Sequence, residues 1–202
     1  WYHAHHNTNE QIERGLYGAL IVRDPRHETT LGVPREHDRL LVLDDIKLDD
    51  ANRIAPFATD LAAEFVPWQR AEELANARIG THVLVNGRHA AKDAPPTLEV
   101  TAGAPYRLRL INAASGHIFR LDIGDHPSAL WAIGSDQGLW NAAEPVTPID
   151  EILHPLGHHE ERISNPDPAR GVTLTPGDRA ELVLVPRSEE HTSELQSLTN
   201  LV

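Results

Sequence analysis

The chain has no cysteine and no methionine among its 202 residues. Without cysteine, this segment has no disulfides, no zinc-thiolate sites and no thiol nucleophiles, and any thiolate ligand to a metal must lie elsewhere. Without methionine, it also has no initiator residue. We therefore expect the chain to be a piece of a longer protein.

Basic residues and long apolar runs are also scarce. Lys and Arg total 18 against 30 Asp and Glu, which gives a formal net charge of -12. Nucleic acids and anionic membranes bind basic surfaces, so this balance predicts no nucleic-acid partner. No apolar run approaches the roughly 20 residues of a membrane helix, so we expect no membrane span.

Short stretches of alternating apolar and polar residues, separated by Gly and Pro, predict many strands and few helices. The clearest is the strand expected over 106–112, in which apolar and basic residues alternate through Tyr106-Arg107-Leu108-Arg109-Leu110 as in a half-buried strand. Thr175-Pro176-Gly177-Asp178 predicts a type II turn and Asn86-Gly87 a hairpin turn. One helical pattern covers 67–78. Strands are expected over 18–23, 39–43, 82–86, 97–100, 106–112, 119–123, 129–133, 172–174 and 179–185.

Histidines are numerous, 13 in all, and two groups of them are clustered. In an extended strand, His3 and His5 point the same way with their backbones about 7 Å apart, which is typical of a metal-ligand pair. His6 falls on the opposite face and is expected to face solvent. The second group is His154, His158 and His159, with Glu160 and Glu161. It could form an accessory Cu or Zn site, but a solvated loop explains it more simply.

The motif around His3 extends further along the chain. Trp1-Tyr2-His3-Ala4-His5, then Gln11, then Gly15-Leu16-Tyr17-Gly18 before an apolar stretch, resembles the end of the first cupredoxin domain of multicopper oxidases. Further stretches resemble the middle cupredoxin domain of that family in the right order: 84–88, 96–100 with Gly103, 106–113, 132–138 and 174–182.

This resemblance implies an all-β fold, a cupredoxin-like Greek-key β-sandwich with one partial and one near-complete domain. The end of the first domain would cover 1–25, an interdomain linker 26–38 and the second domain 39–186. The remaining tail, 187–202, contains a match to a translated sequencing-library adapter, so we expect it to be non-native and exclude it from fold reasoning.

The resemblance also implies roles for individual residues. His3 and His5 would be ligands of the type 3 copper pair in a trinuclear cluster, one to each ion, and Gln11, Gly15 and Gly18 would be structural. The other ligands, and the type 1 copper site with its cysteine, would lie in first-domain and third-domain segments of the parent outside this chain.

The function implied for the parent is a copper-dependent oxidase. It would couple one-electron oxidation of a small reducing substrate, phenol-like or a metal ion, to the reduction of dioxygen to water. The family also implies export to the periplasm or outside the cell. This segment alone is expected to be inactive.

Two other functions remain open. One is a non-enzymatic cupredoxin-fold binding or assembly module without copper. A distant one is a cupin-type metalloenzyme, suggested by His3, His5 and Glu10, although the second cupin motif is absent. The remaining polar features are expected to be structural: His126 and Asp136 as scaffold residues, and Asp44-Asp45 and Asp49-Asp50 as turn and solvent charges.

Overall fold

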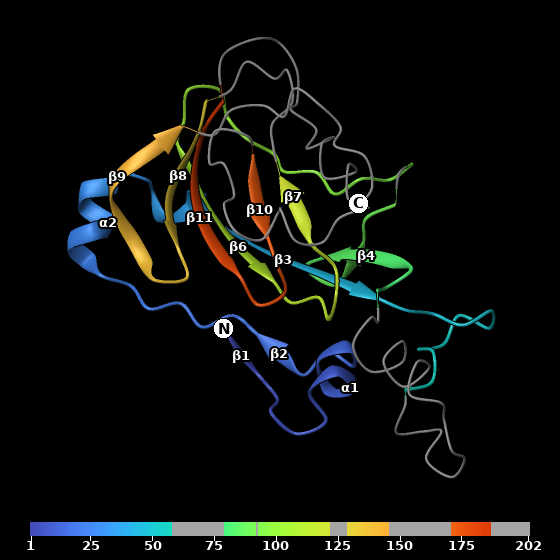
Figure 1. Cartoon of the computed structure of the whole chain (residues 1–202). Helices are drawn as coiled ribbons and strands as arrows, with labels where there is room; N and C mark the ends of the chain where they lie inside the picture. Colours follow the sequence, from blue (N-terminus) through green and yellow to red (C-terminus); the bar gives the residue numbers. More distant parts are fainter. Residues whose placement is uncertain (58–78, 92, 122–128, 146–170, 187–202) are drawn as a thin grey trace.

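The computed structural model describes residues 1–57, 79–91, 93–121, 129–145 and 171–186. The helix expected over 67–78, His126, the cluster at His154, His158 and His159, and the tail 187–202 lie outside these ranges. The described chain is mostly β, as predicted, with short helices near the amino terminus (Figure 1).

A seven-stranded mixed sheet forms one layer, in the order β5-β4-β3-β6-β11-β8-β9. Only β3 and β6 run parallel, and the other neighbours are antiparallel. The strands are β3 (Asp38–Ile46), β4 (His82–Val85), β5 (Arg88–His89), β6 (Tyr106–Asn112), β8 (Ala129–Ser135), β9 (Gly138–Pro145) and β11 (Arg179–Val185).

A second layer covers the inner face of this sheet. Its strands β7 (Phe119–Leu121) and β10 (Val172–Leu174) pair antiparallel. Phe119 and Leu174 pack with Leu43, Leu110 and Leu182 of the large sheet, and all five side chains are almost fully buried. Because two sheets enclose one apolar core, the fold is the expected sandwich.

Most expected strands are confirmed, including 106–112, 172–174 and 179–185. The strand expected over 97–100 is wrong: Leu98 and Val100 pack against the core without joining a ladder. The strand expected over 18–23 is also wrong beyond Gly18, since only β2 (Tyr17–Gly18) pairs, with β1 (Tyr2–His3). Sequence reasoning missed β9 and the helix α1 (Thr8–Glu13).

Both predicted turns are present. Asn86 and Gly87 have φ of 50° and 74°, as a type I′ hairpin between β4 and β5 requires. The Asn86 side chain also accepts from Val42 N and donates to Leu40 O, both at 2.9 Å, which fastens the turn to β3. At the other turn, Asp178 N donates to Thr175 O at 3.0 Å.

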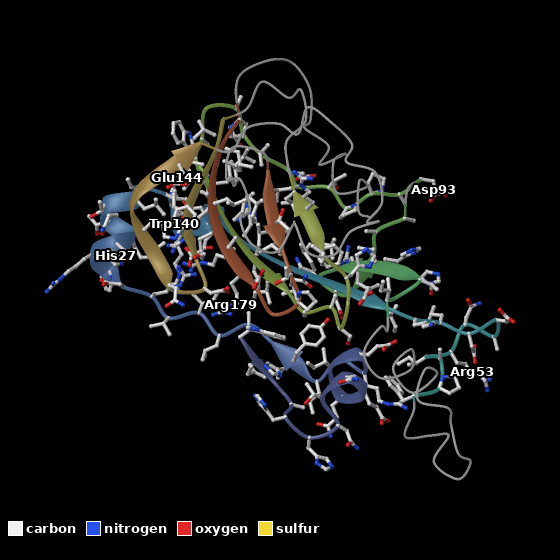
Figure 2. The ribbon with its side chains drawn as sticks, viewed as in Figure 1. His27, Arg53, Asp93, Trp140, Glu144 and Arg179 are labelled. Atoms are coloured by element: carbon white, nitrogen blue, oxygen red, sulfur yellow. The ribbon has the colours of Figure 1, made fainter. Side chains whose placement is uncertain are left out.

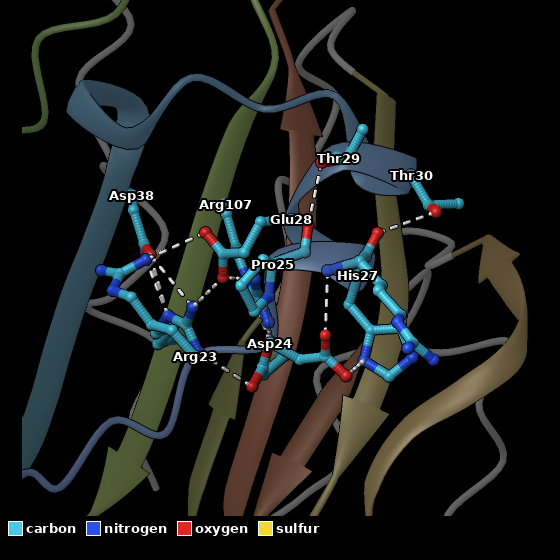
Figure 3. Close-up of polar contacts among 12 residues, drawn as sticks. Arg23, Asp24, Pro25, His27, Glu28, Thr29, Thr30, Asp38 and Arg107 are labelled. Carbon is cyan, nitrogen blue, oxygen red and sulfur yellow. Dashed lines mark hydrogen bonds and ion pairs between the residues drawn. The ribbon is translucent and has the colours of Figure 1, made fainter.

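The helix α2 (Pro25–Leu31) lies on the outer face of the large sheet (Figure 3). It begins one residue before the expected linker 26–38 and otherwise falls within it. Asp24 caps this helix by accepting from Arg26 N at 2.9 Å, and Pro25 occupies its first turn. A 3-10 turn, η1 (Arg35–His37), then leads into β3. The segment between the two expected domains is therefore structured and docked.

Ion pairs hold α2 to the sheet. Glu28 accepts from Arg107 at 3.0 Å, from Arg109 at 3.4 Å and from Arg23 at 3.1 Å. Arg107 also donates to Glu181, and Arg109 donates to Asp38 at 2.8 Å. The expectation that 106–112 is half-buried is therefore wrong. All seven residues are buried, because α2 and these carboxylates cover the arginines.

Charges balance within this group, with three guanidinium groups facing the carboxylates of Glu28, Asp38 and Glu181. Burial alone would raise the pKa of Asp38, but Arg109 and Arg23 outweigh it and hold that pKa below its ordinary value. The arginines that looked like the exposed face of a strand are the internal counter-ions of the docked helix.

Candidate metal centre

His3 and His5 lie side by side near the amino terminus. Their ring centres are 4.6 Å apart with planes inclined by 32°, and the Trp1 ring centre lies 4.5 Å from that of His3. Residues 1, 3 and 5 therefore present a row of rings on one face, as strand alternation requires, although the strand itself covers only Tyr2–His3.

The hydrogen bonding of His3 fixes which ring nitrogen is free. Its Nδ1 lies 3.0 Å from the carbonyl oxygen of Ala4. Because a carbonyl can only accept, Nδ1 carries the proton and donates it, so Nε2 keeps its lone pair. An imidazole held in this way by a carbonyl is typical of metal-ligating histidines.

The loop between β1 and β2 ends α1 in a Schellman motif. Gly15 N donates to Ile12 O at 2.7 Å and Leu16 N donates to Gln11 O at 2.8 Å. Gly15 has φ of +89°, which a residue with a Cβ rarely adopts. In this motif Gly15 supplies the positive φ, and Gln11 takes part through its backbone carbonyl.

Gly18 lets β1 and β2 approach closely. It pairs with Tyr2 across the two-stranded sheet, and a Cβ built on it would lie 2.5 Å from Cζ of the Tyr2 ring. The neighbouring pair in the ladder is His3 with Tyr17. The Gly15-Leu16-Tyr17-Gly18 motif thus sets the register that places Tyr17 opposite His3.

Tyr17 joins this amino-terminal unit to β3. Its hydroxyl donates to Oδ2 of Asp44 at 2.5 Å, and its ring makes an edge contact with Trp1 at 6.4 Å. Burial, and then the bond to Asp44, raise the pKa of Tyr17, so it remains a neutral donor. A second link runs from Lys47 N to Glu13 of α1, at 2.9 Å.

Asp44 is buried, and its carboxyl is an unusually weak acid. Its pKa is raised to about 7, mainly by burial and also by the charges of Asp45 and Glu13. The hydrogen bonds donated by Tyr17 and by Asp45 N lower this pKa, but by less. Asp45, also buried, contacts Nδ1 of His117 at 3.3 Å and accepts from Gly80 N. The expectation that Asp44-Asp45 are turn and solvent charges is therefore wrong.

The apolar residue Ile46 directly after the two acids is the sequence signal that the strand continues, and β3 does extend to Ile46. Asp49 behaves as expected for a turn residue, since it accepts from Ala51 N and Arg53 N, both at 2.9 Å. Asp136 has the expected structural role, pairing with Arg179 at 2.9 Å.

Among the residues that the structure describes, no group of three or more His, Cys, Asp or Glu side chains could hold a metal ion. Glu10, the third residue of the cupin alternative, is instead bonded to Arg14 at 2.9 Å on α1. No helix in these same ranges is long and apolar enough to cross a membrane.

Comparison with protein families matches residues 59–130 to the multicopper oxidase model. The structure is similar to a multicopper oxidase from Pseudomonas thermotolerans, with a TM-score of 0.57 and 23% identity over 94% of this chain and 35% of that one. At this identity the likeness concerns the fold, and it confirms the cupredoxin-like sandwich.

The curated relatives include laccases and a cell division protein. The chain is 34% identical to a laccase of Bacillus subtilis over 69% of its own length and 26% of the laccase. It is 30% identical to the cell division protein FtsP of Salmonella typhimurium over 91% of its length and 35% of FtsP. The chain thus spans about a quarter to a third of these relatives.

Proposed function

Because the chain belongs to the multicopper oxidase family, we propose that it is part of a copper-dependent oxidase and that His3 and His5 are ligands of its type 3 copper pair. The observation that carries this proposal is the adjacent pair of imidazoles, with Nε2 of His3 left free by the bond to Ala4. Imidazole nitrogen suits copper, and copper bound there would supply the electron transfer to dioxygen.

The chain's own part is to hold these ligands rigidly. The β1–β2 ladder fixes the backbone at His3, and Trp1 packs against the His3 ring. Tyr17 ties the same unit to Asp44 in the middle domain. Ligands supported in this way keep their geometry, which a metal site built from several domains requires.

The finer assignments follow the family resemblance. The reducing substrate would be phenol-like or a metal ion, oxidised one electron at a time at a type 1 copper site outside this segment, and dioxygen would be reduced to water. The protein would act in the periplasm or outside the cell. Residues 1–25 would close the first cupredoxin domain and 39–186 would form the second.

A copper-free assembly module is the second candidate function. The match to the cell division protein FtsP covers 91% of this chain, whereas the match to the Bacillus laccase covers 69%. In that case the row of Trp1, His3 and His5 would be a packing feature. The two functions differ in whether the parent protein holds copper and consumes oxygen.

The test uses the protein encoded by the natural reading frame that contains this sequence. It would be loaded with copper, its metal content measured, and oxygen consumption followed with a phenol and with Cu(I). An oxidase should hold several copper ions and consume oxygen with one of these substrates. H3Q and H5Q should each lose bound copper and at least about a hundredfold in rate, since a lost metal ligand removes the centre.

H6Q is the matched control, because His6 is an exposed neighbour in the same segment. It should retain copper and rate. Full activity in H3Q or H5Q would exclude these residues as ligands, and a wild-type protein without copper or oxygen consumption would favour the assembly module.

A further inference from the structure

A second pair of imidazoles lies on the β4–β5 hairpin. The ring centres of His82 and His89 are 4.8 Å apart, with planes inclined by 57°. In the ladder His89 lies opposite Leu84, so His82, two residues before Leu84, is its diagonal neighbour on the same face. The two rings meet because the hairpin register brings them together.

Alternation along the hairpin sends this pair outward. Val83, Val85 and Ala90 point to the core, where Val85 is buried and the other two pack against it. His82 and His89 therefore occupy the outer face, His82 partly exposed and His89 exposed. An ion in solution can reach both rings.

Thr81 holds the Nδ1 side of the His82 ring. The Thr81 hydroxyl oxygen accepts from Leu48 N at 3.2 Å, points its own proton towards Ile46 O at 3.4 Å and lies 2.9 Å from Nδ1 of His82. A hydroxyl oxygen can also accept, so in the tautomer that carries its proton on Nδ1 the His82 ring donates to Thr81. Nε2 of His82 is then free to bind a metal, with its second nitrogen anchored as metal-ligating histidines require.

The ring spacing fits one shared ion. A metal–nitrogen bond of about 2.0–2.1 Å places the ion about 3.2 Å from each ring centre. Two rings on one ion then have centres about 4.5 Å apart at a right angle and about 5.2 Å apart at a tetrahedral angle. The observed 4.8 Å lies between these values.

We propose that His82 and His89 form a surface site for one divalent transition-metal ion, with Cu(II) bound most tightly and water completing the coordination. Two neutral imidazoles favour Cu(II) over Zn(II) in the usual order of affinities. The net charge of -12 attracts cations to the surface. The site is separate from His3 and His5, since β4 and β1 lie apart in Figure 1.

The experiment measures carbethoxylation of each histidine in the whole chain by peptide mass spectrometry, with and without Cu(II). In the wild type, labelling of His82 and His89 should fall several-fold together, and Zn(II) should need a higher concentration for the same protection. In H82Q the protection of His89 should be lost, and in H89Q that of His82, because one imidazole alone binds weakly.

H27Q is the control, since His27 projects from α2 on the side of the molecule opposite β4 (Figures 1 and 2). It should leave the protection of both hairpin histidines unchanged. Labelling without metal shows that the hairpin keeps its fold in each variant. If His82 stays protected in H89Q, or if neither residue is protected in the wild type, the shared site does not exist.

Discussion

Asp44 connects the chemistry of a single residue to the stability of the chain. It is buried where Tyr17 meets β3, and its pKa is raised to about 7 by burial and by the charges of Asp45 and Glu13. The unfolded chain releases this proton near an ordinary carboxyl pKa of about 3.9, whereas the folded chain keeps it to higher pH. Stability must therefore fall as pH rises between these two values.

We predict that ionisation of Asp44 lowers the free energy of unfolding by about 2–3 kcal/mol as pH rises from about 5 to about 8. This follows from a slope of about 1.36 kcal/mol per pH unit over most of that window. Asp44→Asn replaces the titrating carboxyl with a neutral amide, so this loss of stability with rising pH should disappear. The measurement is the free energy of unfolding in urea across that range, for the wild type and for D44N.

Two further variants sharpen this test. D50N changes an exposed acid of the next turn and should keep the wild-type pH dependence. Y17F removes the bond that lowers the pKa of Asp44, so the loss of stability should extend to higher pH. Parallel stability curves for wild type and D44N would contradict the raised pKa.

At this scale, the sequence predicts a residue's face better than its partners. Strand alternation is local, so it places His3 and His5 together. The Tyr17–Asp44 bond joins residues 27 positions apart, and the Asp45–His117 contact joins residues 72 apart. No local pattern contains such contacts, and two acids after an apolar strand look like a turn unless the strand is known to continue.

At the scale of elements, α2 is held to the sheet mainly by charge. None of its residues is buried, yet Glu28 meets three guanidinium groups on the sheet side of the helix (Figure 3). Arg107 and Arg109 are themselves buried, so losing the carboxylate leaves buried charge without its counter-ion. The docking of α2 thus depends on one side chain.

We predict that Glu28→Gln weakens this docking by about 1–3 kcal/mol, as expected for charge-assisted hydrogen bonds. Backbone amides of α2 should exchange with deuterium roughly tenfold faster or more, since about 1.4 kcal/mol is a factor of ten. Hydrogen exchange followed by mass spectrometry measures this directly, and amides of β6 and β11 should be unaffected.

E36Q is the matched control, since Glu36 is an exposed acid of the adjacent η1. It should exchange like the wild type. Unchanged exchange of α2 in E28Q would mean that the helix is held by its caps and loops and not by the ion pairs.

The sequence predicts a strand where apolar residues alternate with others along it, as in β10 and β11. It misses elements whose apolar residues show no regular spacing. The six residues of α1 begin without a side-chain cap and are too few to show a helical period. In β9, Leu139 and Trp140 are adjacent, as are Ala142 and Ala143, so its sequence does not alternate between apolar and polar residues. The alternation in β6 correctly predicts the strand, but it cannot show that a helix from another segment covers its basic face.

At the scale of the whole molecule, the core and the amino-terminal unit differ sharply. The sandwich encloses a continuous apolar core, whereas Leu20 and Val22, beyond the end of β2, are 70% and 85% exposed. Tyr2 and Leu16 are also more than half exposed, at 58% and 55%. Several exposed apolar side chains in one short segment are typical of an interface, here proposed to be with other parts of the first domain.

We predict that the 202-residue chain self-associates through this surface, because burying apolar area yields about 25 cal/mol per Å². Sedimentation velocity should show association that increases with protein concentration. L20K/V22K should shift the chain towards monomer, whereas I79K, which changes an apolar residue 54% exposed elsewhere on the molecule, should not. The net charge of -12 opposes association, so salt should strengthen it in the wild type. A monomeric wild type at high concentration, or association unchanged in L20K/V22K, would show that these side chains are not an interface.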